Sequence, residues 1–230
     1  MVATVRSTDH AVAPHRRTSR RLPRVEREQQ MLDAAHALFA ERGFAETTMD
    51  DVAAAAGITK PLLYNYFGNK ERLYLACMAP AGEALVATVL DAVASTSNAA
   101  DALDAGLRAF FGFLAADRAA WRVLFDETLP AGGEVAHGVG EYRDRITDLV
   151  GEALLAQLPS SRRRRASIEV EALSVAVLGA AEALGRWWLL TDAIAADEAA
   201  QMLIETLGPG LRDRAAEIAP SASRPAEDGR

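Results

Sequence analysis

Apolar residues recur every three or four positions along most of this 230-residue chain, the spacing of helices that bury one face. The first predicted helix covers residues 24–42 and ends at Gly43, because glycine readily adopts the left-handed conformation that terminates helices. No segment shows the two-residue alternation of a half-buried strand. The pattern therefore predicts an all-α fold. The buried stripe of the first helix consists of Leu32, Ala35, Leu38 and Phe39.

The later helices are separated by turn-forming residues. A long helix is predicted from Glu71, and Pro80 should break or kink it, because proline lacks an N–H and its ring clashes with the preceding turn. The sequence Gly208-Pro209-Gly210 should end the last long helix. The other helices are predicted from residue 99, around 121–125, and over 134–158, 166–190 and 197–207.

Residues 47–70 combine two short helices with a tight turn. Gly57 suits the left-handed residue of that turn, and Thr59 and Pro61 are favoured where the next helix starts. The first of the two helices begins with a capping box, in which a hydroxyl and an acidic side chain satisfy two free backbone N–H groups. Two registers fit this box, Thr48 with Asp51 or Thr47 with Asp50.

The second short helix has two different faces. Leu63 and Phe67 lie four residues apart and should both point into the core. Its other face carries polar and aromatic side chains that a core does not need. Many proteins present such a face to the major groove of DNA, so the motif predicts a DNA-binding site, with two small packed helices and no ligand as the alternative. The outward residues are Lys60, Leu62, Tyr64 and Asn65.

The chain resembles the TetR family of bacterial transcription regulators over about residues 24–75. The similarity lies in the helix from Glu26 to Phe44, in the run ITKPLLYNYF at residues 58–67 and in NKERL at residues 69–73. It implies an N-terminal three-helix helix-turn-helix DNA-binding domain and a larger helical ligand-binding and dimerisation domain. The resemblance also implies base contacts by Lys60, Pro61, Leu62 and Asn65, and phosphate contacts by Thr48, Tyr64, Tyr66 and Lys70.

These expectations divide the chain into four parts. They are a disordered basic arm (1–23), the DNA-binding domain (24–70), the helical effector-binding and dimerisation domain (71–218) and a disordered tail (219–230). Clustered arginines in the arm suit contacts with phosphates or a minor groove, and a solvated tail is the alternative. The arginine run at 162–165 fits a solvated surface better than a second nucleic-acid site.

The predicted helices over 166–190 and 197–207 are too apolar to be buried on one face only. Their small residues permit close contacts between helices. Regulators that this chain resembles pair these two helices with those of a second copy, which predicts a homodimer. Ala180 and Leu203 are candidate positions in the dimer seam.

Aromatic residues are frequent in the middle of the chain and lie at helical spacing, which suggests an apolar ligand pocket. A packed core without a cavity is the alternative. Glu182 and Arg186 have the spacing of an intrahelical ion pair, and the other interpretation is that they line the pocket or the seam. The candidate pocket residues are Phe110, Phe113, Trp121, Phe125, Tyr142 and Trp187.

Charge and composition narrow the function further. The chain has 25 basic and 32 acidic residues, whereas residues 1–72 hold 11 basic and 9 acidic ones, so a mildly basic end precedes an acidic body. A single cysteine, Cys77, allows no internal disulfide and fits a cytoplasmic protein. No run of 18 apolar residues is free of charge, which predicts no membrane span. The sequence contains no recognisable metal, cofactor or catalytic motif, so we expect none of these and no enzymatic activity.

The sequence therefore predicts a homodimeric transcription regulator that binds a pseudo-palindromic double-stranded DNA operator. In the main hypothesis it is a repressor that a small apolar or amphipathic effector releases from DNA. The alternatives are an activator, a regulator that senses a protein partner, and a helical enzyme or carrier whose helix-turn-helix is only structural.

Overall fold

The computed structural model describes residues 23–97, 99–126, 128–156 and 160–218. Within these ranges the chain forms nine α-helices and no strand, which confirms the all-α prediction. Apart from Pro23, the predicted arm and tail lie outside the described residues. The helices are α1 (Arg24–Glu46), α2 (Met49–Ala55), α3 (Lys60–Phe67), α4 (Lys70–Ala94), α5 (Ala99–Ala116), α6 (Arg118–Leu124), α7 (Gly133–Ala156), α8 (Ser160–Thr191) and α9 (Ala196–Ile218).

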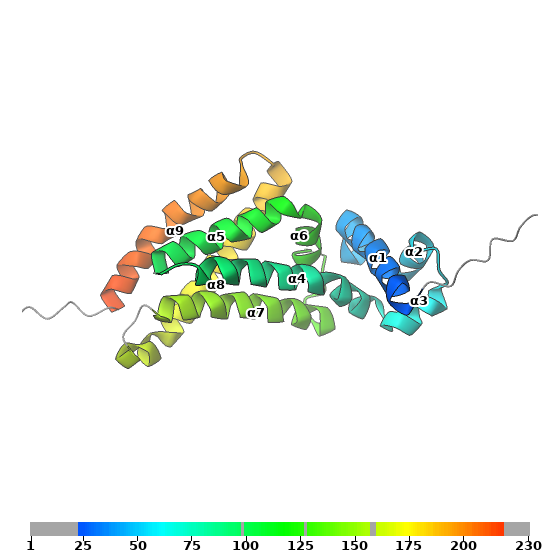
Figure 1. Ribbon diagram of the computed structural model, residues 1–230, viewed down its shortest axis with the longest axis horizontal. Coiled ribbons are helices and arrows are strands. Elements are labelled where there is room, and N and C mark those ends of the chain that lie inside the picture. The colour runs from blue at the N-terminus through cyan, green and yellow to red at the C-terminus, as the bar shows by residue number, and fades with distance from the viewer. Residues whose placement is uncertain (1–22, 98, 127, 157–159, 219–230) are drawn as a thin grey trace, which may run out of the picture.

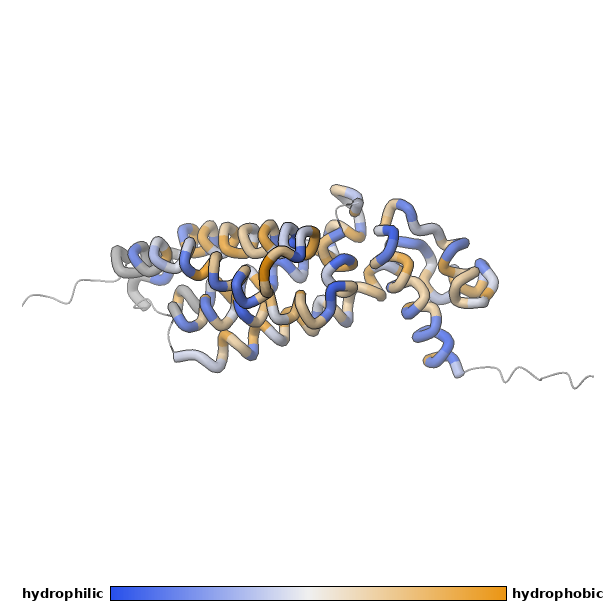
Figure 2. Tube along the Cα trace, turned by 90° about the horizontal axis from the view of Figure 1, so that it is seen from above, coloured by the Kyte–Doolittle hydropathy of each residue, from blue (hydrophilic) through white to orange (hydrophobic). Residues whose placement is uncertain are grey.

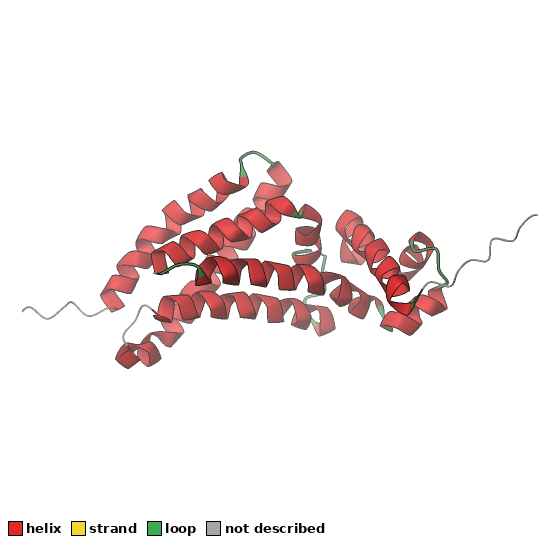
Figure 3. Cartoon of the chain, viewed as in Figure 1, coloured by secondary structure: helices red, strands yellow, loops and turns green. Residues whose placement is uncertain are grey.

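The helices are arranged in two parts (Figure 1). Helices α1, α2 and α3 make a small N-terminal lobe at one end, and α4 leads from this lobe into the body formed with α5 to α9. In the body α4 packs against α5 and α7, α9 packs on α5, and α8 contacts α7 and α9. Short loops join most of the helices (Figure 3). Apolar and polar residues are interleaved along the helices of both parts (Figure 2), as expected of helices with one buried face.

The N-terminal lobe is held together by a small core to which all three helices contribute. Met31, Ala35 and Phe39 of α1 are buried with Val52 of α2 and Leu63 of α3. A fully buried aliphatic or aromatic side chain of this kind contributes about 1.5–3 kcal/mol. This core fixes the orientation of α3 relative to α1 and α2, and so decides which side chains α3 exposes.

Helix α4 connects the lobe to the body and is long and apolar enough, by composition alone, to span a membrane. Its apolar side chains pack instead against α1, α5, α6 and α7, as in the central helix of a folded body. The hydroxyl of Tyr74 donates a hydrogen bond to the carbonyl of Val123 in α6. Gly82 lets the ring of Tyr142 on α7 come close, because an added Cβ would lie 2.7 Å from that ring. Helix α4 is therefore tied to both α6 and α7.

The structure differs from the sequence predictions at two prolines. Helix α4 continues through Pro80 without a break, and α9 continues through Gly208-Pro209-Gly210, where we expected it to end. Both prolines are exposed, so each helix loses one hydrogen bond on its solvent side while its opposite face stays packed. Tertiary packing overrides the local preference here. Helix α8 also begins earlier than predicted, at Ser160, so the arginine run at 162–165 belongs to its first turns.

Candidate DNA-binding site and effector cavity

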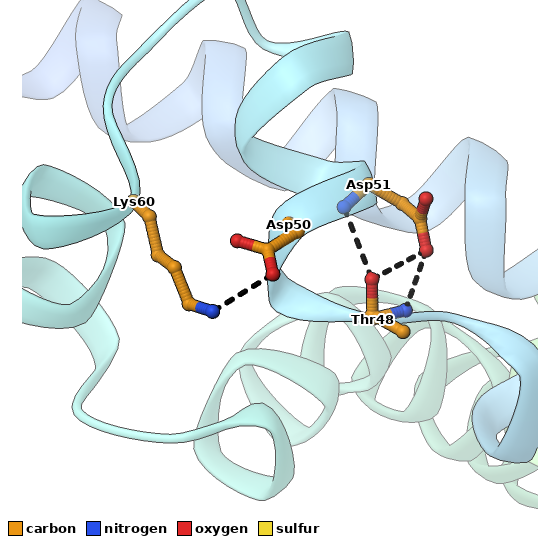
Figure 4. Close-up of polar contacts among 4 residues, drawn as sticks. All are labelled: Thr48, Asp50, Asp51 and Lys60. Atoms are coloured by element: carbon orange, nitrogen blue, oxygen red, sulfur yellow. Dashed lines mark hydrogen bonds and ion pairs between the residues drawn. The ribbon is translucent and has the colours of Figure 1, made fainter.

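The start of α2 settles the register of the capping box. The backbone N–H of Asp51 donates to the Thr48 hydroxyl oxygen at 3.2 Å, and the N–H of Thr48 donates to the Asp51 carboxylate at 3.0 Å (Figure 4). Hydrogen bonds from the Thr48 hydroxyl and N–H lower the pKa of Asp51. Thr47 is buried, and its hydroxyl donates to the carbonyl of Gly43 at 2.8 Å. Because the hydroxyl proton of Thr48 is directed at Asp51, a phosphate contact by Thr48 would have to replace that bond.

The turn between α2 and α3 has the predicted geometry. Gly57 is in the left-handed region with φ = +63°, and the N–H of Ile58 donates to the carbonyl of Ala53 at 2.9 Å. Thr59 occupies the N-cap position of α3, but its side chain makes no capping hydrogen bond, which corrects the expectation that it caps this helix. Pro61 lies in the first turn of α3, where its missing N–H has no partner to lose.

Helix α3 exposes the side chains that sequence analysis assigned to base contacts, with one exception. Lys60, Pro61 and Asn65 are exposed, whereas Leu62 is only half exposed and packs partly against the core. Tyr64 is also exposed. Leu63 and Phe67 are buried, as predicted from their spacing. The outward face of α3 is therefore polar, with Lys60 at its start.

Tyr66 lies between the solvent and the start of α1. It is half-buried, and the guanidinium of Arg24 stands 5.5 Å from the centre of its ring, within the range of a cation–π contact. This contact places the first residue of α1 beside α3. The N-terminal end of α1 therefore lies close to the proposed DNA-binding helix.

Lys60 forms an ion pair with a neighbouring helix. Its ammonium lies 2.8 Å from the carboxylate of Asp50 in the first turn of α2 (Figure 4). The hydrogen bond from Lys60 to Asp50 raises the pKa of Lys60. Both side chains remain about half exposed or more, at 48% and 66%. The lysine is thus positively charged, solvent-accessible and held in one direction by Asp50.

Lys70, the other lysine of the chain, forms hydrogen bonds within the protein. Its ammonium donates to the backbone carbonyls of Phe44 at 2.7 Å, Thr47 at 3.0 Å and Ala45 at 3.5 Å. It also lies 4.2 Å from the centre of the Phe44 ring. An ammonium has three N–H donors, and here each has an acceptor within the protein. Lys70 therefore holds the junction between α1 and α2, a role that the sequence pattern did not reveal.

We expect Lys70→Met to destabilise the N-terminal lobe. The substitution retains the apolar stem but leaves carbonyls at the end of α1 without their charged donor, which should cost about 1–3 kcal/mol. Thermal or urea unfolding followed by circular dichroism measures the change. Lys60→Met is the matched control, because its exposed ion pair should contribute little to folding. Equal stability of both variants would contradict the structural role of Lys70.

The loop after α6 contacts the same junction from the body. The carboxylate of Asp126 accepts a hydrogen bond from the N–H of Phe44 at 2.5 Å, and the hydroxyl of Thr128 accepts one from the N–H of Ala45 at 3.1 Å. Gly43 has φ = +78°, and a Cβ there would lie 3.0 Å from the Thr128 hydroxyl. Asp126 was not among the predicted site residues, because its partner in the N-terminal lobe, Phe44, lies more than 80 residues away in the chain.

The six aromatic residues predicted to form one pocket are distributed over several places. Trp121 and Phe125 stack on each other with ring centres 3.6 Å apart and line a cavity of about 320 Å³ between α6, α7 and α8. We call it the α6–α8 cavity. Phe110 lines a smaller apolar cavity of about 50 Å³, and Phe113 and Tyr142 line other hollows. The α6–α8 cavity is further lined by Asp126, Leu129, Val139, Gly140, Arg143 and Glu182.

Helical spacing did not predict which aromatic residues line the same cavity, because residues on one helix can face different neighbouring helices. Trp187, the sixth predicted residue, is 42% exposed on α8 and lines none of these four cavities. Glu182 is buried and forms a two-pronged ion pair with Arg143 of α7, a partner that the sequence spacing did not predict. Arg143, Glu182 and Arg186 all line the α6–α8 cavity, so its wall is partly charged.

Helix α8 also presents an apolar outer face. Ile168, Val175 and Leu190 are 79%, 58% and 81% exposed. Gly179 follows Val175 by four residues and so shares its face, and a Cβ added there would meet no atom within 4 Å. On α9, which packs beside α8, Met202 is 51% exposed. A face of this kind is unusual in a soluble monomer and marks a surface for association.

The two positions that we predicted in the dimer seam do not lie on this face. Leu203 is buried in the core of the body, and Ala180 packs partly against the same core. Both belong to the predicted helices, but they point towards the neighbouring helices of their own chain. A one-residue difference along a helix turns a side chain by about 100°, so the apolar pattern alone could not separate the two faces.

Comparisons with known proteins agree with this architecture. The family model of bacterial regulatory proteins, tetR family, matches residues 31–77, and that of the tetracyclin repressor-like C-terminal domain matches residues 99–208. A TetR-like transcriptional regulator from Rhodococcus sp. RHA1 has a similar structure, with a TM-score of 0.67 and 35% identity, and the match covers 84% of this chain and 99% of that one.

Two curated relatives are similar along most of their length. The transcriptional activator FasR of Mycolicibacterium smegmatis is 33% identical over 76% of this chain and 78% of its own. The probable regulator ArpR of Pseudomonas putida is 30% identical over 72% of this chain and 81% of its own. Regulators of this kind bind operator DNA as dimers and respond to small-molecule effectors. The chain belongs to the TetR family of bacterial transcriptional regulators.

Proposed function

We propose that this regulator inserts α3 into the major groove and reads bases with Lys60, Pro61, Leu62 and Asn65. The observation that carries the proposal is the outward face of α3, which exposes a lysine and an amide while Leu63 is buried behind it. An asparagine amide matches the N6 and N7 edge of adenine, and a lysine ammonium matches the O6 and N7 edge of guanine. Half-exposed Leu62 suits only an apolar surface such as a thymine methyl group.

Phosphate contacts in this proposal come from Tyr64, Tyr66 and Thr48, whose hydroxyl groups suit phosphate oxygens. Lys70 was predicted with them, but its hydrogen bonds to three carbonyls favour a structural role. Residues 24–70 would form the DNA-binding domain and residues 71–218 the effector-binding and dimerisation domain. The tail and most of the arm lie outside the described residues.

We propose that the active form is a homodimer joined through α8 and α9. The exposed apolar face of α8 supports this, because burying it against a second copy removes apolar surface from water. Two copies related by twofold symmetry place two α3 helices on one side of the DNA, which suits a pseudo-palindrome with half-sites about one helical turn apart.

The α6–α8 cavity is the proposed effector site. Its wall combines the Trp121 and Phe125 rings with charged groups such as Arg143, which suits an amphipathic small molecule. Asp126 lies in this wall and also accepts the hydrogen bond from Phe44 of the N-terminal lobe. An effector that shifts the loop after α6 would therefore act directly on the lobe, in addition to any movement of α4.

The direction of regulation has two candidate forms. In the first, the protein is a repressor, and the effector binds the state that does not fit DNA more tightly than the state that does. In the second it is an activator, which the similarity to the activator FasR favours. The position of the bound operator relative to the promoter separates them: a site that overlaps the promoter indicates repression, and a site upstream of it indicates activation.

The base-reading assignment is tested with operators selected from random duplexes by the purified protein. We expect Lys60→Ala to weaken operator binding by about tenfold to a hundredfold and to relax the preference at one position in each half-site. Fluorescence anisotropy on the operator and on random DNA, over a range of salt concentrations, measures both effects. If Lys60→Ala weakens binding to both DNAs equally, Lys60 contacts phosphate and does not read a base.

A further inference from the structure

The carboxylate of Asp50 is exposed beside Lys60, the residue that the proposed function places in the major groove, where a negative charge is unfavourable for DNA binding. Lys60 is the one basic residue in the sequence from 49 to 67, and Asp50 lies 2.8 Å from its ammonium. The adjacent acid, Asp51, already serves the capping box, whereas Asp50 takes no part in it. As an acidic residue in the first turn of α2, Asp50 also interacts favourably with the helix dipole, whereas its exposed ion pair contributes little to folding.

The chemistry of the pair matches a specific base-pair edge. In the major groove a G·C pair presents the guanine N7 and O6 acceptors next to the cytosine N4–H donor. Lys60 supplies donors, and Asp50 supplies an acceptor within hydrogen-bond distance of them (Figure 4). Lysine to guanine and aspartate to cytosine are both established pairings in protein–DNA recognition. The two side chains together are therefore complementary to one G·C pair.

A carboxylate beside Lys60 would also weaken binding to DNA that lacks this pair. On such DNA the carboxylate meets phosphates and base acceptors, which repel it, and the charge of Lys60 remains partly neutralised by Asp50. On the matching pair the cytosine amino group satisfies the carboxylate and the guanine satisfies the ammonium. Specificity of this type comes from a penalty on the wrong partner as well as from contacts with the correct one.

From this geometry we propose that Asp50 is a specificity-determining residue that reads one G·C pair per half-site jointly with Lys60. The proposal rests on the proposed function, because it requires α3 to lie in the major groove. It goes beyond that function by assigning a base pair and by giving an acidic residue of α2 a role in recognition.

The test compares Asp50→Asn with Glu41→Gln in the full-length protein. Both substitutions remove one negative charge from the N-terminal lobe, and the two side chains are similarly exposed, at 66% and 68%. We expect Asp50→Asn to tighten binding to random DNA several-fold and to steepen the salt dependence by about one unit per protomer, because Lys60 is released to contact phosphate. Glu41→Gln should change neither quantity.

Operators with the G·C pair exchanged for each other pair provide the second measurement. In the wild type we expect one position per half-site where the exchange weakens binding by about tenfold or more, and Asp50→Asn should remove most of that penalty. A retained penalty, a preference of that position for A·T, or unchanged binding to random DNA would overturn the proposal. Unchanged thermal unfolding of the variant shows that its fold is retained.

Lys60→Ala separates this proposal from the one on which it rests. Equal losses on operator and random DNA in Lys60→Ala contradict base reading by α3 as proposed. A selective loss in Lys60→Ala combined with a wild-type profile in Asp50→Asn leaves base reading by Lys60 in place and contradicts only the joint role of Asp50. The double variant should behave like Lys60→Ala if the two residues act as one unit.

Discussion

Gly179→Glu should convert the dimer into monomers and lower operator affinity by at least a hundredfold. Gly179 lies on the exposed apolar face of α8, and an added side chain meets no atom of its own chain within 4 Å. The monomer should therefore fold normally, and replacing glycine inside a helix favours the helix. At a dimer seam the same carboxylate would be buried without a partner, which costs about 3–5 kcal/mol. Monomers lose the gain in affinity that two linked DNA-binding helices provide.

Gly112→Glu is the matched control for this experiment. Gly112 is an exposed glycine inside α5, and a Cβ added there also meets no atom within 4 Å. The chemical change is identical, but it lies outside the proposed interface, so the dimer should persist. Sedimentation or light scattering gives the mass, and anisotropy gives the operator affinity. A Gly179→Glu protein that remains a dimer with full operator affinity would place the interface elsewhere.

Asp126→Ala should uncouple the α6–α8 cavity from the N-terminal lobe. Without its carboxylate the N–H of Phe44 loses its acceptor, and the loop after α6 keeps only the weaker bond between Thr128 and Ala45 at the α1–α2 junction. Gly140 lines the α6–α8 cavity with open space beside it, so Gly140→Trp serves as a defined substitute for a bound effector. We expect Gly140→Trp to change operator affinity about 5- to 150-fold, the usual range of allosteric coupling, and to have little effect when combined with Asp126→Ala.

Glu134→Gln provides the control for Asp126. Glu134 also links the body to the lobe side of α4, through an ion pair with Arg72 at 3.2 Å, but both of these side chains are largely exposed. Exposed ion pairs contribute little to the stability of a contact between two parts of a protein. Glu134→Gln should therefore leave the effect of Gly140→Trp on operator affinity unchanged. If Gly140→Trp acts equally in the wild type and in Asp126→Ala, the coupling does not pass through Asp126, and α4 becomes the principal path.

Local sequence determined the helix-turn-helix almost completely. The glycine at 57, the acidic residue three positions after Thr48 and the apolar pair at 63 and 67 each act on neighbours within one or two turns. The local structure that they favour can therefore be predicted without knowledge of the rest of the chain. The exceptions are Thr59, which makes no capping hydrogen bond, and the capping box, where two registers fitted equally well. The burial of Thr47 in the lobe core decided between them, because only Thr48 was then left to cap α2.

Contacts between segments that are distant in sequence determined the course of the long helices and the ion pairs between them. Pro80 and Pro209 did not interrupt their helices, because buried side chains on the opposite face hold each helix in place. Glu182 has a partner on α7 that sequence spacing did not predict, because the orientation of packed helices sets which side chains of different helices meet.

The sequence by itself determined the family, the all-helical architecture and the side chains that α3 exposes, since these depend on periodicity and on short-range hydrogen bonds. Only the tertiary structure decided which aromatic residues surround a cavity, which face of α8 remains uncovered, and that Asp126 and Lys70 hold the α1–α2 junction. Each of these features depends on the relative positions of helices far apart in the chain. Such positions follow from the packing of the whole core and not from any local pattern.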